Sequence, residues 1–305
     1  MTLVRRVAAG QDGVVTREQA LAAGLTVREI DRLCRSREWR RLARAAYLVD
    51  LTPSPVAARR ARIRAAVASF GELATAVLGT SAELHGLAGL RPDARIHVSV
   101  PGPAARPLRS KDPAVVVHQL VIPAGQIGTV AGIRTTTATR TAADLALRVD
   151  RFAAVSLLDS ALHQGSITEP DLLVVRALLA RRRGAVAARR HLAEADGRAE
   201  SPLETRVRLR CVDGGVPPDA LQHPVRDDDG HLLAVGDLAW LRERIIGEAD
   251  GALVHATPEA LYRDRRRQNL IANAGWRVLR FTWADTLNPT YIPTTIRAAQ
   301  THPAR

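Results

Sequence analysis

Three acidic residues, Asp237, Glu248 and Asp250, lie where the surrounding sequence predicts buried structure. Apolar residues 232–235 lead into Asp237, and residues 241–246, which end in Ile245 and Ile246, lead into Glu248. Both approaches are typical of buried strands, and a short charged turn between them predicts a hairpin. We therefore expect one carboxylate at the end of each strand of this hairpin.

The spacing of these acidic residues indicates a cation. Glu248 and Asp250 are two residues apart, so in a strand their side chains point to the same face, and Asp237 on the neighbouring strand can join them. Converging carboxylates repel one another and are costly to bury unless a cation offsets their charge. Mg²⁺ prefers such an all-oxygen environment, so the pattern predicts a divalent cation here.

Sequence on either side of this hairpin extends the pattern. Upstream, residues 200–204 (ESPLE) open a helix; downstream, a basic helix over residues 264–270 precedes the sequence GWRVLRF at residues 275–281. In this order, residues 199–300 resemble an uncharacterised family related to very-short-patch-repair endonuclease, within the PD-(D/E)xK restriction-endonuclease-like superfamily. The resemblance implies a mixed sheet flanked by helices and a Mg²⁺-dependent DNA endonuclease.

The same resemblance implies roles for individual residues. Asp237 and Glu248 would be the metal ligands, with Glu204 and Asp250 as further acidic members of the catalytic site. Water activated by Mg²⁺ would attack a DNA phosphate. The basic helix would bring Arg266 or Arg267 toward that phosphate, unless it is only a surface helix.

One departure from the superfamily leaves an alternative open. The usual lysine is absent, because Asp250 occupies the position two after Glu248 and Lys111 is the only lysine in the chain. An inactive descendant of the nuclease fold is therefore the alternative. Glu204 is also the third residue of a helix that Ser201 would cap, and Asp237 could pair with a neighbouring arginine.

The N-terminal residues predict a DNA-binding module. Thr16 and Thr26 are each followed three residues later by Gln or Glu, which predicts two capped helices, and Gly24 would end the first of them. Two helices joined by a tight glycine turn are typical of a helix-turn-helix. Residues 39–49 predict two short strands around a basic turn, which would form a wing.

The run at residues 14–49 resembles the N-terminal winged-helix domain of AbiEi-type abortive-infection antitoxins, and the resemblance spans about residues 1–50. The sequences SAELHGL, IHVSVP, VVHQL and GIRTTTATRTAADLA extend the resemblance to about residue 165, and residues 95–100, 114–120 and 132–137 predict strands there. The resemblance implies DNA binding, autoregulation and a possible cognate toxin partner. The implied DNA contacts are Arg28, Arg32 and Arg35 on the second helix and Arg40, Arg41 and Arg44 at phosphates. A winged helix that packs only against protein is the alternative.

The charge distribution fits a basic front half and an acid-centred back half. The net charge of the 305-residue chain is +13. Basic residues outnumber acidic ones by ten to six in residues 1–50 and by 19 to ten in residues 51–195, whereas residues 196–305 hold 15 of each. Such a distribution suits a protein that holds DNA with its front half. Arginine-rich composition alone is the competing explanation.

The cysteine content and the hydropathy of the sequence argue against a zinc protein, a disulfide-rich protein and a secreted or membrane protein. Only two cysteines occur, without the spacing of a zinc site, and no disulfide framework is expected. We find neither an apolar signal core nor a stretch of membrane-spanning length, so we expect a cytoplasmic protein without membrane contact.

Together these features predict a modular α/β protein. Its three parts are a winged helix at residues 1–50, a mixed middle domain at 51–195 and a restriction-endonuclease-like domain at 196–305. The predicted function is a DNA-binding protein with a Mg²⁺-dependent endonuclease domain. The alternative is an AbiEi-like antitoxin or transcriptional autoregulator whose nuclease-like domain is inactive. The sequence predicts no oligomeric state.

Overall fold

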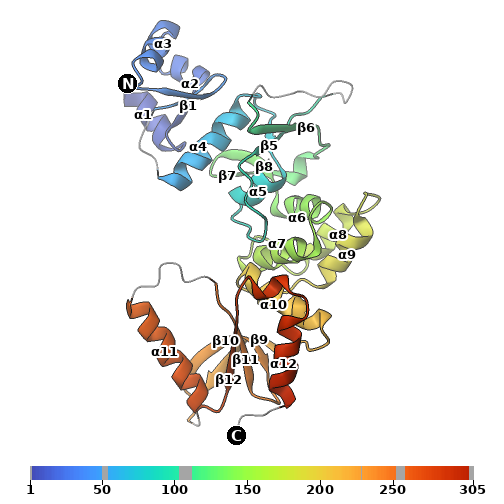
Figure 1. Ribbon diagram of the computed structural model, residues 1–305. Helices are drawn as coiled ribbons and strands as arrows, with labels where there is room; N and C mark the ends of the chain where they lie inside the picture. The colour runs from blue at the N-terminus through green and yellow to red at the C-terminus, as the bar shows by residue number, and fades with distance from the viewer. Residues whose placement is uncertain (1, 50–53, 103–111, 228, 252–257, 302–305) are drawn as a thin grey trace. The chain divides into compact units, whose positions relative to one another are not determined.

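The computed structural model describes residues 2–49, 54–102, 112–227, 229–251 and 258–301 (Figure 1). Two compact units make up the chain, one consisting of residues 1–87, 91–147 and 170–180 and the other of the remaining residues. Helices and sheets occur together in both units, so the chain is of mixed α/β type as predicted. The division into three domains at residues 50 and 195 stays a prediction.

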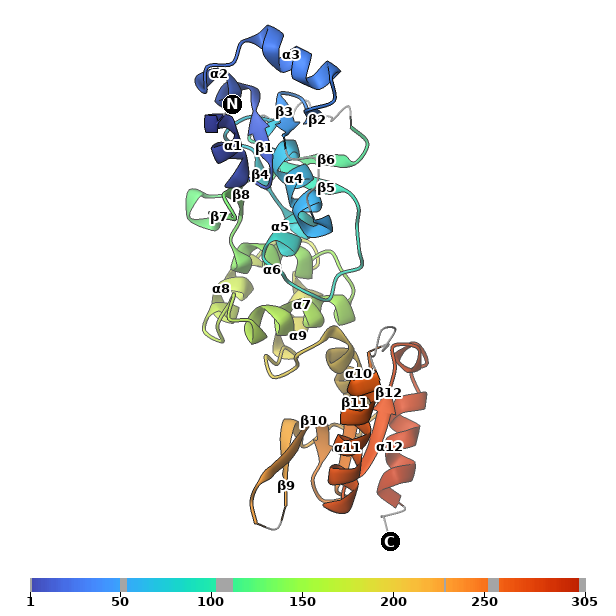
Figure 2. The same ribbon diagram turned by 90° about the vertical axis from the view of Figure 1, so that its left-hand side faces the viewer.

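The first part of unit 1 is a small helical segment closed by a three-stranded antiparallel sheet of order β1-β3-β2. Thr16 and Thr26 each cap a helix reciprocally with the residue three positions on, as predicted. In both views α3 lies at the outer edge of this segment, away from α4 (Figures 1 and 2). The elements are α1 (Thr2–Ala9), β1 (Val14–Thr16), α2 (Arg17–Ala22), α3 (Val27–Arg35), β2 (Arg40–Ala43) and β3 (Ala46–Leu48).

The N-terminal segment has its own apolar core. Ile30 and Leu33 of α3 pack with Trp39, Tyr47 and Val4 in one buried cluster. A second cluster joins the sheet to the following helix, α4 (Pro55–Ala68), through Leu48 and Ala65 among others. The apolar face of α3 is therefore turned inward, and its arginines are left outside.

The rest of unit 1 is a five-stranded mixed sheet of order β6-β5-β4-β8-β7. Strands were predicted near β5, β6 and β8, whereas β4 and β7 were not. The structure adds an apolar cluster that fills the space between α4 and this sheet. The elements are β4 (Thr75–Ala76), α5 (Leu78–Leu84), β5 (Ile96–Ser99), β6 (Val115–His118), β7 (Ile127–Val130), β8 (Ile133–Thr136), α6 (Ala138–Ala146) and α8 (Asp171–Leu178).

Unit 2 contains a four-stranded sheet of order β12-β11-β10-β9 with helices on both faces (Figure 1). β9, β10 and β11 are antiparallel neighbours, and β12 runs parallel to β11. The elements are α7 (Arg151–His163), α9 (Ala185–Ala193), α10 (Pro202–Asp213), β9 (Ala220–Arg226), β10 (Leu232–Trp240), β11 (Ile245–Ala249), α11 (Pro258–Asn273), β12 (Arg277–Phe281) and α12 (Tyr291–Thr301).

Alternation along the strands separates two cores in this sheet. Leu238 and Trp240 of β10 pack with residues of α10 and α12, whereas Ala239 and Ile246 pack with Ile271 of α11. Successive side chains of a strand point to opposite faces. Asp237 and Glu248 therefore share the α11 face with Ala239 and Ile246.

The predicted hairpin is confirmed as the β10–β11 pair, with one difference. Trp240 pairs with Ile245, so β10 continues three residues past Asp237, which lies inside the strand rather than at its end. None of the helices that the structure describes is long and apolar enough to cross a membrane.

Candidate functional site

In the N-terminal segment, all the arginines predicted to contact DNA are exposed. On α3, the alternation of buried Ile30 and Leu33 with outward residues follows the helical period. On the β2–β3 hairpin, the guanidinium of Arg41 lies 5.6 Å from the centre of the Tyr47 ring. The exposed set comprises Arg28, Arg32 and Arg35 of α3 with Arg40, Arg41 and Arg44 of the hairpin.

The net charge of α3 itself is small. Glu29 and Asp31 lie on the same helix as its three arginines. Hydrogen bonds from the backbone and side chain of Thr26 lower the pKa of Glu29, which keeps this carboxylate charged. Most of the positive excess therefore comes from the arginines of the hairpin, which is the pattern expected where phosphates are held beside a helix that approaches the bases.

A buried ion pair anchors the N-terminal segment to the remainder of unit 1. The carboxylate of Asp12, in the turn before β1, lies 2.5 Å from Arg60 Nη2 through Oδ1 and 2.8 Å from Arg64 Nη2 through Oδ2. Arg64 also donates to the carbonyl of Ala131, in the turn between β7 and β8, at 2.5 Å. Burial opposes the charge of Asp12, but the hydrogen bonds from the two arginines outweigh it and lower its pKa.

The second candidate site is the acidic group of unit 2. Asp237 accepts a hydrogen bond from the backbone N–H of Ala249 at 2.8 Å, next to Glu248 on β11. Glu248 is buried, with 8% of its surface exposed. The structure thus brings Asp237 and Glu248 to neighbouring positions on one face of the sheet, as predicted.

Burial perturbs the carboxyl group of Asp237. Desolvation raises its pKa to about 7, and the nearby charges of Glu204 and Glu248 act in the same direction. Glu204 approaches from α10, where its backbone N–H is capped by Ser201. Its carboxylate accepts the backbone N–H of Glu200 at 2.9 Å and the amide of Gln222 at 3.0 Å.

Two basic residues nearby, Arg267 and Arg280, contact these carboxylates. Arg267 of α11 donates to both oxygens of Glu248, at 2.7 and 3.0 Å, and to the carbonyl of Val235 at 2.5 Å. Arg280 of β12 lies 3.5 Å from Asp250, which follows the end of β11. Arg266, predicted with Arg267 to meet DNA phosphate, is exposed on α11.

The carboxylate oxygens of this acidic group can be judged against the ligand set that a divalent cation requires. Mg²⁺ needs several oxygens converging at about 2.1 Å from one point. Among the residues that the structure describes, the three-residue group whose ligand atoms come within 4.8 Å of one another is Asp227, Asp229 and His231, not the predicted ligands. The predicted Mg²⁺ site at Asp237 and Glu248, and the catalytic roles of the four carboxylates, stay predictions.

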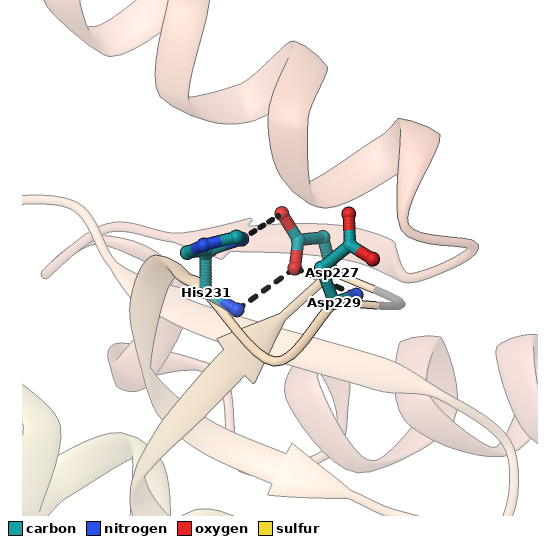
Figure 3. A group of neighbouring side chains, drawn as sticks. All are labelled: Asp227, Asp229 and His231. Atoms are coloured by element: carbon teal, nitrogen blue, oxygen red, sulfur yellow. Dashed lines mark hydrogen bonds and ion pairs between the residues drawn. The ribbon is translucent and has the colours of Figure 1, made fainter.

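The group at Asp227 lies in the turn between β9 and β10 (Figure 3). Asp227 accepts the backbone N–H groups of Asp229 and His231, at 3.1 and 2.8 Å, and lies 3.3 Å from Nδ1 of His231. These are the local bonds of an Asx-type turn, which explain the clustering without a ligand.

Two comparisons with known proteins bear on this chain. Residues 74–195 match the family model of the AbiEi antitoxin C-terminal domain. The uncharacterized proteins Rv2248 and MT2308, from two strains of Mycobacterium tuberculosis, are each 34% identical to this chain over 218 residues, which is 72% of this chain and 78% of each relative. The chain belongs to the family of these two proteins.

The AbiEi resemblance is confirmed for the region of the family match. The matched residues 74–195 run from β4 through α9. The resemblance of residues 199–300 to a restriction-endonuclease-like family stays a prediction, as does the winged-helix assignment.

Sequence reasoning missed two residues that contact the acidic group. Gln222 holds Glu204, and Arg280 faces Asp250. Arg280 had a signal, because in a strand it occupies the same face as Val278, on the side packed by α11. Gln222 had no such signal, because Gln222 itself adopts a φ of 50°, which no strand pattern predicts.

Proposed function

We propose that this chain is a DNA-binding antitoxin that represses transcription of its own operon. The observation that carries the proposal is the match of residues 74–195 to the AbiEi antitoxin domain. The N-terminal segment supports it, because the order α1-β1-α2-α3-β2-β3 with an antiparallel sheet is that of a winged helix.

In this proposal α3 is the recognition helix. Its outward residues Arg28, Arg32 and Arg35 enter the major groove, where an arginine can bond two acceptors of a guanine. The arginines of the β2–β3 hairpin hold the phosphates on either side. Ile30 and Leu33 fix the helix on the core, so its exposed face is presented without rearrangement.

The antitoxin proposal also implies a protein partner. AbiEi-type antitoxins resemble this chain over the middle region, and a cognate toxin encoded beside the gene is the partner that such a protein would oppose. A neighbouring gene for a nucleotidyltransferase-like toxin would support this part of the proposal. Co-expression of both proteins, with growth as the measurement, tests it directly.

DNA binding is tested by fluorescence anisotropy with the duplex upstream of the gene. We expect the double variant Arg28→Ala/Arg32→Ala to bind at least about tenfold more weakly than wild type, since each arginine contact contributes roughly 1–3 kcal/mol. Arg189→Ala, an exposed arginine on α9, is the matched control and should bind like wild type.

The salt dependence of DNA affinity tests whether the arginines of the β2–β3 hairpin contact phosphates. Wild-type affinity should fall steeply between about 50 and 200 mM salt, and removal of Arg40 and Arg41 should flatten the slope by roughly two counterions. Equal loss of binding in the α3 variant and the Arg189→Ala control would refute α3 as the DNA-binding element.

A further inference from the structure

The acidic group of unit 2 already contains a cation of its own. The guanidinium of Arg267 meets Glu248 through two parallel contacts of 2.7 and 3.0 Å, the geometry in which arginine binds a carboxylate most strongly. A third contact of 2.5 Å joins the same guanidinium to the carbonyl of Val235 on β10. Arg267 therefore links α11 to two adjacent strands of the sheet.

The remaining carboxylates are also satisfied by protein groups. One oxygen of Asp237 accepts the N–H of Ala249, and Asp250 lies 3.5 Å from Arg280. The α11 side of the sheet thus brings two guanidiniums to three carboxylates. At Glu248 itself, Arg267 already neutralises the charge that an added divalent cation would meet.

A metal at Glu248 would have to displace Arg267. Arginine stays protonated at all accessible pH values, so the guanidinium cannot leave by losing its proton. Glu248 is only 8% exposed, so separating it from Arg267 would leave a buried carboxylate without its partner, whereas the Arg267 side chain is 35% exposed. A cation bound to Glu248 would also be repelled by Arg267, which contacts the same carboxylate.

We propose that Arg267 takes the place of a divalent metal in this site, so that the sheet and α11 are held together by an ion pair and not by a bound cation. The inference concerns unit 2 alone and does not depend on the antitoxin proposal. It accounts for the absent lysine, because a site organised by an arginine pair needs neither the metal nor its usual lysine partner.

The test removes the guanidinium of Arg267 and measures whether a divalent metal can then bind Glu248 in its place. Arg267→Gln leaves Glu248 buried and unpaired, so the variant should melt at a lower temperature and should be stabilised by Mg²⁺ or Mn²⁺. At a metal concentration about ten times the Kd, linkage raises the melting temperature by roughly 3–6 °C for a unit of this size. Wild-type protein should show no such rise.

Two matched variants control the result. Arg266→Gln removes a neighbouring exposed arginine of α11 and should behave like wild type, with or without metal. The double variant Glu248→Gln/Arg267→Gln removes both charges and should melt without any response to metal. Every protein in this melting comparison, including the reference that keeps Arg267 and Glu248, carries Asp227→Asn, so that the exposed group at Asp227 cannot bind the added cation.

The proposal has clear refuting outcomes. It is overturned if Mn²⁺ binds the wild-type site in isothermal titration calorimetry and Glu248→Gln abolishes that binding, a measurement that does not depend on the folding of the Arg267 variant. It is also overturned if Arg267→Gln folds and melts identically with and without metal. Metal-dependent stabilisation confined to Arg267→Gln supports it.

Discussion

Replacing Asp12 with Asn would test the ion pair that anchors the N-terminal segment. The substitution keeps the size and shape of the side chain, and Asn tolerates the positive φ of 55° at this position. It removes the negative charge that faces both Arg60 and Arg64. The measured quantity is the stability of unit 1, with DNA affinity as a second readout.

The magnitude follows from the burial of the partners. Removing one member of a buried ion pair costs about 3–5 kcal/mol. The Arg60 side chain is 41% exposed and can regain water, whereas the Arg64 side chain is only 10% exposed. Arg64 keeps its bond to the Ala131 carbonyl, and the amide oxygen of Asn still accepts one donor. We therefore expect a loss of about 2–3 kcal/mol.

The assay is thermal unfolding followed by circular dichroism. A loss of this size should lower the melting temperature of unit 1 by about 5–10 °C. Asp31→Asn, at an exposed position of α3, is the control and should change it by less than about 2 °C. A melting temperature unchanged by Asp12→Asn would show that the arginines gain as much from water as from Asp12, which would refute the anchoring role.

Two further predictions concern pH and catalysis. Because the pKa of Asp12 is lower in the folded chain than its usual 3.8, the stability that it contributes is complete above that value and is lost as the pH falls through the folded pKa. Chemical denaturation between about pH 5 and pH 2 should show this loss in wild type, with a smaller slope in Asp12→Asn; equal slopes would contradict it. Since Arg267 occupies Glu248, we expect purified protein to leave supercoiled plasmid intact in Mg²⁺ or Mn²⁺. Metal-dependent nicking that Asp237→Ala and Glu248→Ala both abolish would instead establish the predicted endonuclease.

The elements that sequence predicted best depend on near neighbours along the chain. Thr16 and Thr26 cap their helices through bonds to residues three positions away, so both helix starts were readable. The spacing of Arg28, Arg32 and Arg35 against Ile30 and Leu33 likewise follows from helical geometry alone. Short-range geometry is the same wherever the helix sits.

Strand limits depended on partners that sequence does not reveal. β4 has two residues and exists because β5 and β8 pair with it on either side. Asp237 was expected at the end of its strand, but pairing of Trp240 with Ile245 carries β10 further. Cross-strand hydrogen bonds set these limits, and their register follows from packing.

The sequence by itself determined the local chemistry of this protein: the capped helices, the exposed arginines and the placing of carboxylates on adjacent strands. Only the tertiary structure decided which cation those carboxylates meet. Arg267 reaches Glu248 from 19 residues away, and Arg280 reaches Asp250 from 30 residues away. Such pairs form because α11 packs on the sheet and β12 pairs with β11, which brings residues distant in the chain together, and the buried Glu248 requires a partner that no local pattern can specify.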